Sequence, residues 1–507
     1  MAINIIFHIL IPVLFFLSFQ IKSAGISFIA IYAFMLYFLS ARIENKKTFR
    51  STFIIFFLFW LMMLNWLLVI NVNLTPLQRV LIGIGWIFLS ALMGLVWSVP
   101  FSFISIKNRE IYLLPVALSA VEYLLSSTRD LSFLWVTPST AVIDYPVFIQ
   151  TADLGGSYLV SLLVIMFAVI LFRLFSIKRD TFDKMLFAIL LFSVIIYGSI
   201  RISEDYEGER INVTVVQPNI PGEMKESYRE FIEFRFNSIK ENLKKAESQD
   251  GELVIFPETA SPVYLSKNSN NQIKQYLQDF TDSTGKSILI GGLTYEYGEK
   301  RNNDRYFNSA FYFSRGETIQ TYHKIRCVPF VERMPYEEKL KFLRKIDYGQ
   351  GGYSVGAKQT ILDSAGSRIS AYICFESIFP TYVSSFAKNG AKLLVNISED
   401  AWFIKGIGAK QHFQAGILRA VENRRWLVRS SNPGYSAVID PTGRIIYRTV
   451  LNTAEVFTEE VVLIDKLTFF ASSGNLLPKL FLITALLTLI VKILRRKNDK
   501  SKIENSA

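Results

Sequence analysis

The chain has 507 residues, of which 51% are apolar and 42 are phenylalanine, and it carries a formal net charge of +12. That length accommodates two or three domains. Much of the basic excess lies in short loops and in the C-terminal tail, so the charge does not indicate nucleic-acid binding, and no nucleic-acid motif, internal repeat or low-complexity segment is present.

The apolar residues are unevenly distributed along the chain. Residues 1–200 are dominated by long apolar runs, residues 201–470 have the composition of a soluble protein, and residues 476–494 are apolar again. Crossing a bilayer takes about 20 apolar residues, which a soluble core does not need. The first run has no Lys or Arg before Lys22, unlike a cleaved signal peptide, so we expect it to be retained. The sequence therefore predicts eight transmembrane helices, at 3–21, 24–41, 52–74, 79–106, 111–125, 154–175, 185–200 and 476–494.

The basic residues predict the orientation of these helices. With the N-terminus in the cytoplasm, the inside loops and tail carry fifteen Lys and Arg residues, and the outside loops carry three. The segment between the seventh and eighth helices then lies outside the membrane, in the periplasm of a bacterium. We expect a membrane domain at 1–205, an outside domain at 206–470, and a last transmembrane helix with a basic cytoplasmic tail at 471–507.

Glu122 is an exception among the apolar residues of the fifth helix. A carboxylate within a membrane is costly and usually has a partner or a task. Arg129, seven residues further on, is the candidate partner, and a solvated position near the interface is an equally good interpretation. The loop that follows, 131–150, is rich in aromatic residues, which fits either a membrane–water belt or a rim through which lipids enter.

The outside domain alternates predicted strands with predicted helices, which is typical of α/β layering. The turn at Asp440–Arg444, DPTGR, indicates a late hairpin. The predicted strands are Ile211–Gln217, Glu252–Phe256, Ser287–Leu293, Asn308–Phe313, Arg368–Cys374, Leu393–Ile397, Trp426–Ser430 and Ser436–Ile439, and the predicted helices are 223–248, 270–283, 377–388 and 408–423.

Three reactive side chains each follow a predicted strand. Glu258 follows ELVIFP, Lys324 follows QTYH, and Cys374 follows RISAYI. A thiol has a pKa of about 8.5, so a carboxylate that takes its proton and an ammonium that faces the developing oxyanion both help it at neutral pH. Each residue alone has a plainer explanation as a loop acid, a surface lysine or a core cysteine. Together they indicate acyl transfer through a thioester.

The second cysteine, Cys327, lies in the same outside domain as Cys374. In an oxidising compartment the two thiols could form a disulfide, which would exclude Cys374 as a nucleophile. We expect instead that Cys327 is free and not essential.

Three motifs together resemble the carbon–nitrogen hydrolase (nitrilase) superfamily. They are FPETA at Phe256–Ala260, the HK…VPF.E..P pattern within Tyr322–Pro335, and CFES at Cys374–Ser377. With seven spans before the domain and one after it, the whole chain looks like the apolipoprotein N-acyltransferase family. The resemblance implies an α-helical transmembrane bundle joined to a nitrilase-like α/β domain, an αββα sandwich.

The resemblance also implies roles for the residues that match the motifs. Glu258 matches the general base, Lys324 the cation that stabilises the oxyanion, and Cys374 the nucleophile. Glu332 matches a second acid that positions the lysine, and Glu376 matches a further acid. Trp402 matches an aromatic residue near the acyl pocket, and Phe375, beside the nucleophile, is a second candidate for substrate binding. We interpret His412, Arg419 and Glu422 as mainly structural, with Arg419 and Glu422 paired at i, i+3 on one helix face.

This chain departs from the family pattern at several positions. Val331 and Arg333 replace the usual Gly and Tyr, Phe375 replaces a Tyr, Glu399 stands where Asn is usual, and Pro433 interrupts a usual NTG or NNG. None of these changes removes a member of the triad. They put in doubt the shape of the loop over the site and therefore the acyl-donor preference.

The family implies the reaction and its partners. A phospholipid donates its acyl chain to the cysteine, and the α-amino group of the N-terminal diacylglyceryl-cysteine of an apolipoprotein then takes it. No cofactor and no metal are implied, and we expect a monomer in the bacterial inner membrane. The alternatives are a membrane-anchored amidase or nitrilase, an idle lipoprotein-binding paralogue, and a transporter whose outside domain only binds ligand.

Overall fold

The computed structural model describes residues 2–44, 47–70, 75–176, 180–220, 227–267, 271–298, 304–340, 342–343, 351–364, 366–403 and 405–504. Outside these residues lie the start of the helix predicted at 223–248, the first residue of the one predicted at 270–283, the end of the span predicted at 52–74, and Lys46, Lys178 and Arg179.

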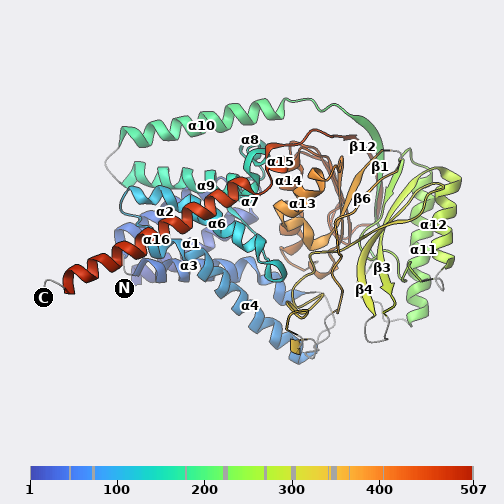
Figure 1. Ribbon diagram of the computed structural model, residues 1–507, viewed down its shortest axis with the longest axis horizontal. Helices are drawn as coiled ribbons and strands as arrows, with labels where there is room; N and C mark the ends of the chain where they lie inside the picture. Colours follow the sequence, from blue (N-terminus) through green and yellow to red (C-terminus); the bar gives the residue numbers. More distant parts are fainter. Residues whose placement is uncertain are drawn as a thin grey trace.

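The long apolar runs form helices that gather in one half of the molecule (Figure 1). Within the described residues, seven helices are long and apolar enough to cross a membrane, and α2 is a shorter apolar helix. Together they confirm the eight predicted spans. The bounds are α1 (Ala2–Gln20), α2 (Ser27–Arg42), α3 (Thr48–Met63), α4 (Pro76–Ser98), α6 (Leu114–Ser127), α9 (Ala152–Ser176), α10 (Thr181–Ile202) and α16 (Leu476–Glu504).

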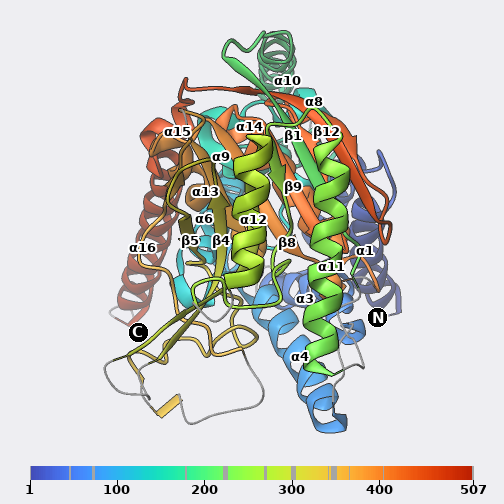
Figure 2. The same cartoon turned by 90° about the vertical axis from the view of Figure 1, so that its right-hand side faces the viewer.

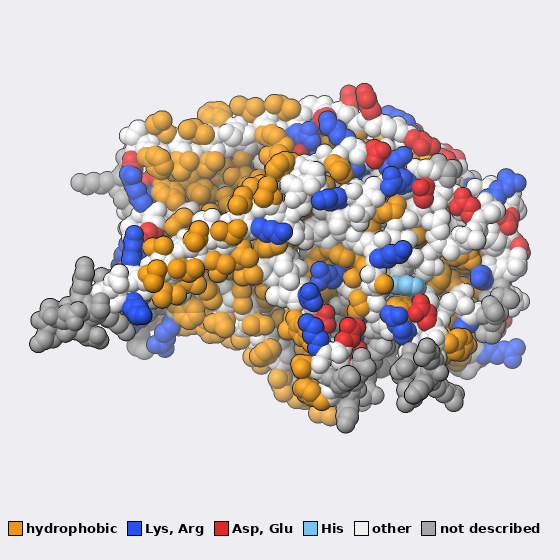
Figure 3. Space-filling view, in the orientation of Figure 1, with side chains coloured by type: hydrophobic (Ala, Val, Ile, Leu, Met, Phe, Trp, Pro, Cys, Tyr) orange, Lys and Arg blue, Asp and Glu red, His pale blue; other side chains and the backbone are white. Residues whose placement is uncertain are grey.

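Side chains on the outside of this half are apolar and exposed. Phe88 on α4, Phe192 on α10 and Ile490 on α16 are 69%, 62% and 50% exposed. Figure 3 shows that apolar side chains cover this half, whereas charged side chains gather over the other half. An apolar surface of this extent is stable against lipid and not against water.

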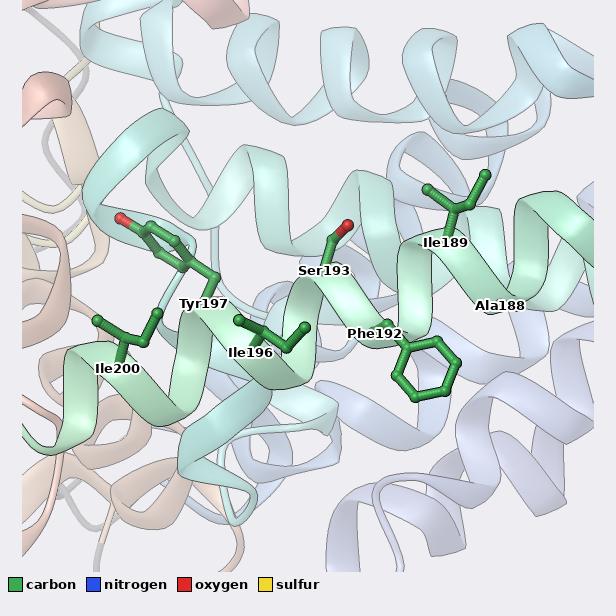
Figure 4. A pocket seen from close by; sticks show the side chains of 7 residues that line it. All are labelled: Ala188, Ile189, Phe192, Ser193, Ile196, Tyr197 and Ile200. Carbon is green, nitrogen blue, oxygen red and sulfur yellow. The ribbon is translucent and has the colours of Figure 1, made fainter.

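One hollow on this apolar surface runs along α10 (Figure 4). It encloses about 610 Å³. Its lining consists of Ala188, Ile189, Phe192, Ser193, Ile196, Tyr197 and Ile200. The groove therefore faces the lipid side of the helix, and no residue of the predicted triad contributes to it.

Short helical segments extend or flank the long helices. They are η2 (Asn65–Val69), α5 (Pro100–Phe103), η3 (Arg109–Leu113), η4 (Arg129–Leu131), α7 (Pro138–Ala141), α8 (Pro146–Ile149) and α15 (Phe469–Ser473).

Two sheets, each of six strands in the described part of the chain, form the other half of the molecule. The first has the order β12-β1-β2-β3-β4-β5 and the second β11-β10-β9-β8-β7-β6. The pairs β1–β2, β2–β3, β7–β8 and β8–β9 are parallel and the rest are antiparallel. The bounds are β1 (Glu209–Gln217), β2 (Leu253–Ile255), β3 (Ser287–Glu296), β4 (Arg305–Phe313), β5 (Gln320–His323), β6 (Ile361–Leu362), β7 (Ile369–Ile373), β8 (Leu393–Glu399), β9 (Leu427–Asn432), β10 (Ala437–Ile439), β11 (Ile445–Arg448) and β12 (Glu455–Leu463).

Helices cover the outer face of each sheet. The helices α11 (Tyr228–Glu247) and α12 (Asn271–Thr284) lie on the first sheet and face the viewer in Figure 2. The helices α13 (Pro380–Lys388) and α14 (Gly408–Asn423) lie on the second sheet, between it and the membrane helices (Figure 1). The layers are therefore helix, sheet, sheet and helix, which confirms the predicted αββα sandwich.

Several local predictions need correction. Strands β6 and β12 were not predicted, and β5 and β11 were indicated only by the QTYH run and by the hairpin turn at Asp440–Arg444. Strand β12 pairs with β1 over nine residues although some 240 residues separate them in the chain. The helix predicted from residue 377 begins at Pro380, because Cys374–Ile378 forms the 3-10 turn η8 and proline favours the first turn of a helix. Glu122 is fully buried on α6, so its solvated interpretation is wrong. Arg129 is exposed.

Polar contacts join the second sheet's helices to the membrane helices. The predicted pair Arg419–Glu422 forms at 2.8 Å, and Glu422 also accepts a hydrogen bond from the main-chain N–H of Ser157, 2.8 Å away, at a kink in α9. Arg424 donates to Asp153 of α9 at 2.9 Å. These buried contacts hold the two halves together, because leaving either partner unpaired would cost the full desolvation of a charge.

Candidate active site

Cys374 lies directly after β7, at the first position of η8. It is 8% exposed and has a φ of +50°. A left-handed conformation costs a non-glycine residue about 1–2 kcal/mol, and such strain is common at functional sites. The sharp turn ends the strand, and the charges of Glu258 and Lys324 act on the thiol that it carries.

Glu258 and Lys324 come from the first sheet. Glu258 follows β2, and Lys324 follows β5, where it is 1% exposed. The Nζ atom of Lys324 lies 3.4 Å from Oε1 of Glu258 and 2.7 Å from Oε1 of Glu332. Glu332 is held in turn by the main-chain N–H of Val328, which donates to its Oε2 at 2.7 Å. The lysine is therefore fixed between two carboxylates.

Two further groups fix Glu258, and no sequence motif indicates either of them. The side-chain amide of Asn308, on β4, donates to Oε1 at 2.6 Å, and the main-chain N–H of Glu399, at the end of β8, donates to Oε2 at 2.7 Å. Asn308 opens a predicted strand with no neighbouring motif, and a main-chain donor leaves no signal in the sequence.

The pKa values of Cys374 and Lys324 are both shifted by their surroundings. Burial raises the pKa of the Cys374 thiol well above its usual value, the charge of Glu258 adds to this, and Lys324 only partly opposes it. The thiol is therefore protonated at rest and needs a base. Burial alone would lower the pKa of Lys324, but Glu258 and Glu332 more than offset it and hold that pKa well above its usual value. Lys324 is therefore a permanent cation in the site.

Glu376 joins the lysine segment to the cysteine segment. It is fully buried. Its carboxylate accepts hydrogen bonds from the main-chain N–H groups of Ile325 (2.8 Å), Arg326 (2.9 Å) and Ile373 (2.7 Å). It also accepts from the hydroxyls of Tyr322 and Tyr382. Burial raises the pKa of Glu376, and these donors oppose that rise. Glu376 therefore links the segment that follows Lys324 to the residue that precedes Cys374.

A second buried network lies beside Cys374. His412, on α14, has its Nε2 atom 3.1 Å from the Cys374 carbonyl oxygen and its Nδ1 atom 2.9 Å from Asp400. Arg429 donates to the other oxygen of Asp400 at 2.8 Å. Burial would raise the pKa of Asp400, but Arg429 and His412 overcome this and lower it.

Donor atoms of Cys374, Asp400 and His412 lie within 4.8 Å of one another, as a metal site would require. The guanidinium on Asp400 would repel a metal ion, so this cluster acts as a hydrogen-bonded support for the turn.

Two aromatic residues of the loop after α6 pack against this support. Phe133 stacks on Phe375, with ring centroids 6.5 Å apart, and on Trp135, 5.9 Å away. Trp135 is 3% exposed and stacks on His412 at 5.7 Å. The membrane–water belt is thus the wrong interpretation for Trp135, because it is buried against α14.

The remaining predicted positions lie in different environments. Phe375 is buried, and Trp402, in η9 (Ala401–Phe403), is 39% exposed. Val331 is 41% exposed, whereas Arg333 is buried and lies 3.4 Å and 3.3 Å from two glutamates that follow it. Nothing in the structure explains Pro433.

Cys327 and Cys374, the only cysteines in the sequence, are both free thiols. The disulfide alternative is therefore wrong. Burial raises the pKa of Cys327, so this thiol is a poor nucleophile at neutral pH.

The sequence matches two family models. Residues 212–465 match the carbon–nitrogen hydrolase family, and residues 13–170 match the apolipoprotein N-acyltransferase N-terminal domain.

Curated relatives at about 30% identity carry one name, apolipoprotein N-acyltransferase. The protein of Geobacter metallireducens is 32% identical over 339 residues, which span 64% of this chain and 64% of the relative. The protein of Rickettsia typhi is 32% identical over 361 residues, 68% of this chain and 70% of the relative. That of Chlorobaculum tepidum is 29% identical over 405 residues, 73% and 74% of the two chains.

Solved structures of the nitrilase superfamily also match. An amidase of Nesterenkonia has 16% identity and a TM-score of 0.38, over 53% of this chain and 95% of its own. Saccharomyces cerevisiae Nit3 has 20% identity and a TM-score of 0.38, over 51% and 92%. The family models and the curated relatives, joined to the two-sheet domain and the apolar helices described above, show that the chain belongs to the apolipoprotein N-acyltransferase family, the multi-pass membrane acyltransferases of the carbon–nitrogen hydrolase superfamily.

Proposed function

We propose that this protein transfers an acyl chain from a phospholipid to the α-amino group of the N-terminal diacylglyceryl-cysteine of an apolipoprotein, through a thioester on Cys374. The observation that carries the proposal is the fixed group Glu258–Lys324–Cys374 on a domain that sits directly on membrane helices. Both substrates have lipid tails in the bilayer and reacting groups at its surface.

The first half-reaction forms the thioester. Glu258 takes the proton of the Cys374 thiol, and the thiolate attacks the ester carbonyl of the phospholipid. The tetrahedral oxyanion that forms faces Lys324, whose charge stabilises it. Glu258 then returns the proton to the departing alkoxide, so the lysophospholipid leaves and the acyl chain remains on sulfur.

The second half-reaction uses the same groups with a new nucleophile. The α-amine of the acceptor attacks the thioester carbonyl, and Glu258 takes a proton from the attacking nitrogen. The intermediate collapses to the amide, and the thiolate leaves and is reprotonated. The supporting acids keep the geometry: Glu332 holds Lys324, and Glu376 braces both segments. Phe375 and Trp402 are the proposed contacts to the acyl chain.

Mass spectrometry of Cys374 tests the reaction class. We expect purified protein incubated with phospholipid alone to gain one acyl mass on Cys374 and to lose it when a lipopeptide amine is added. Free fatty acid without amide product would favour the anchored amidase. An unmodified Cys374 in folded protein would indicate a paralogue that binds lipoproteins without acylating them.

We also propose that the catalytic domain faces the periplasm and that the protein acts as a monomer. The support for the orientation is the excess of basic residues in the opposite loops. In a Cys327→Ser background, a cysteine at exposed Asp250 should react with an impermeant maleimide in intact spheroplasts. A cysteine at exposed Lys47 should react only after the membrane is disrupted. The reverse pattern would overturn the orientation.

A further inference from the structure

Glu399 stands between the two sheets at the catalytic base. It is the last residue of β8, in the second sheet, whereas Glu258 follows β2 of the first sheet. The main-chain N–H of Glu399 donates to Oε2 of Glu258 at 2.7 Å. The other oxygen of the base is held by Asn308 and Lys324, which belong to the first sheet. The orientation of Glu258 therefore depends on how the end of β8 is placed.

The side chain of Glu399 fixes that placement. Its carboxyl accepts a hydrogen bond from the hydroxyl of Thr259 at 3.2 Å and from the amide of Asn432 at 3.1 Å. Thr259 is the residue after the base and has a φ of +52°, a conformation that needs support. Asn432, at the end of β9, accepts a hydrogen bond from the main-chain N–H of Ile220 at 2.7 Å. One carboxyl thus ties together the segments that follow β1, β2, β8 and β9.

The charged side chains that act most strongly on Glu399 come from two other elements. Arg235, on α11, favours the anion and also donates to the Thr259 carbonyl at 2.8 Å, whereas Glu258 disfavours it. Burial is the largest effect and raises the pKa of Glu399 to about 8. At neutral pH the side chain is therefore mostly a neutral acid. The Glu399 side chain can therefore help to orient Glu258 without placing a second negative charge beside the Glu258 carboxylate.

We propose that Glu399 is a positioning residue of the catalytic base, and that its main-chain N–H and its side-chain contacts together hold Glu258 in the orientation that reaches Cys374. This inference rests on the proposed function, because it assigns a partner to the base of that reaction. It concerns a residue that acts through Glu258 and does not contact the acyl group.

Two variants separate the positioning role from a structural one. Glu399→Gln keeps an uncharged side chain of the same shape. Its oxygen can take the bonds from Thr259 and Asn432, and its amide nitrogen takes the place of Oε1, which the main-chain N–H of Ala401 approaches at 3.3 Å. Glu399→Ala removes every side-chain contact and leaves the main-chain N–H in place. We expect Glu399→Gln to acylate Cys374 at a rate close to the unsubstituted protein. We expect Glu399→Ala to be about 10-fold slower or worse, because a general base contributes about 10²–10⁴ and a displaced base forfeits part of that.

The pH profile of Cys374 alkylation by iodoacetamide supplies a readout that a loss of folding would not produce. Because the charge of Glu258 helps to raise the pKa of Cys374, displacing Glu258 should move the alkylation midpoint to lower pH. Glu258→Gln supplies the reference shift. We expect Glu399→Ala to move the midpoint in the same direction as Glu258→Gln, and Glu399→Gln to leave it unchanged. These measurements use the full chain in detergent, with Cys327→Ser as the common background.

Each outcome supports or overturns the positioning role of Glu399. A Glu399→Ala protein with an unshifted midpoint and a normal acylation rate would overturn the positioning role. If Glu399→Gln acylates Cys374 as slowly as Glu258→Gln does, Glu399 does not act as a neutral acid. This comparison does not depend on whether Glu399→Ala folds. If the unsubstituted protein forms no acyl-enzyme, the proposed function fails. The alkylation midpoints would still test whether Glu399 positions Glu258.

Discussion

The brace formed by Glu376 allows the sharpest test of how the site is assembled. Glu376→Gln changes no shape, but it replaces one carboxylate oxygen by an amide that donates. If the remaining oxygen keeps its bonds from Ile325 and Arg326, the new amide faces the N–H of Ile373, donor against donor. A hydrogen bond to a charged group contributes about 1.5–3 kcal/mol, and an unsatisfied buried N–H costs about 1–3 kcal/mol. We therefore expect the substitution to cost about 3–5 kcal/mol.

Both catalytic segments should move when this brace is weakened. A stability loss of that size lowers the Tm of a domain of about 250 residues by roughly 10 °C. Ile373 precedes the nucleophile and Ile325 follows the lysine, so both reacting groups shift, and a 1 Å misplacement can cost about 10²-fold in rate. The assay is single-turnover acylation of Cys374 by phospholipid, with the Tm measured on the same sample in detergent.

Tyr382→Phe is the matched control for this experiment. It removes a single hydroxyl donor from Glu376, 3.0 Å away, and leaves the three main-chain donors in place. Its cost should be about 1.5–3 kcal/mol, because it removes one hydrogen bond to a charged group and leaves no main-chain donor unsatisfied, and the acylation rate should change little. If Glu376→Gln keeps both the normal Tm and the normal rate, the bracing argument is wrong. If it keeps the Tm and loses the rate, Glu376 takes part in the chemistry itself.

Three further predictions concern single groups. Lys324→Ala should slow acylation by about 10²–10³-fold, since one oxyanion donor is worth about 3–4 kcal/mol, and a near-normal single-turnover rate would show that another group faces the oxyanion. Cys327→Ser should keep most of the activity, because this thiol is free and its pKa is raised, and intact-protein mass spectrometry of the variant should still find the acyl adduct. Glu399 has a folded-state pKa of about 8 against an ordinary 4.5, so its stabilisation is complete below about pH 4.5 and is lost as the pH rises towards 8. The Tm of the unsubstituted protein should therefore fall between about pH 5 and pH 8 relative to that of Glu399→Gln, and parallel curves would contradict the neutral form.

The sequence was sufficient to predict that three reactive side chains each follow a strand. ELVIFP, QTYH and RISAYI each place a reactive side chain where a strand ends, and the runs of apolar residues define the spans by length alone. These signals are local, because the strand, its turn and the reactive residue are neighbours in the chain.

The contacts that orient those side chains could not be predicted from local sequence patterns. Asn308 reaches Glu258 across three strands of one sheet, and the N–H of Glu399 reaches it from the other sheet. The strand β12 was missed because its place depends on a partner some 240 residues away, and half-buried strands of this kind carry a weak alternation. The Asn308 contact, the Glu399 contact and the pairing of β12 all depend on tertiary structure. No local pattern in a single sequence indicates them.

The membrane half contributes to the site and does more than anchor it. Phe133 and Trp135, between α6 and α7, stack on Phe375 and His412, which flank the nucleophile. Asp130, in the same loop, accepts a hydrogen bond at 2.9 Å from the main-chain N–H of Tyr336, just beyond the loop that carries Glu332. An anchor needs one helix and no contact with the catalytic turn. Here the segment that leaves the membrane packs on both the cysteine side and the lysine side of the site. This contact with both sides of the candidate site supports the proposed function, because both proposed substrates have lipid tails in the bilayer and would approach the site along these helices.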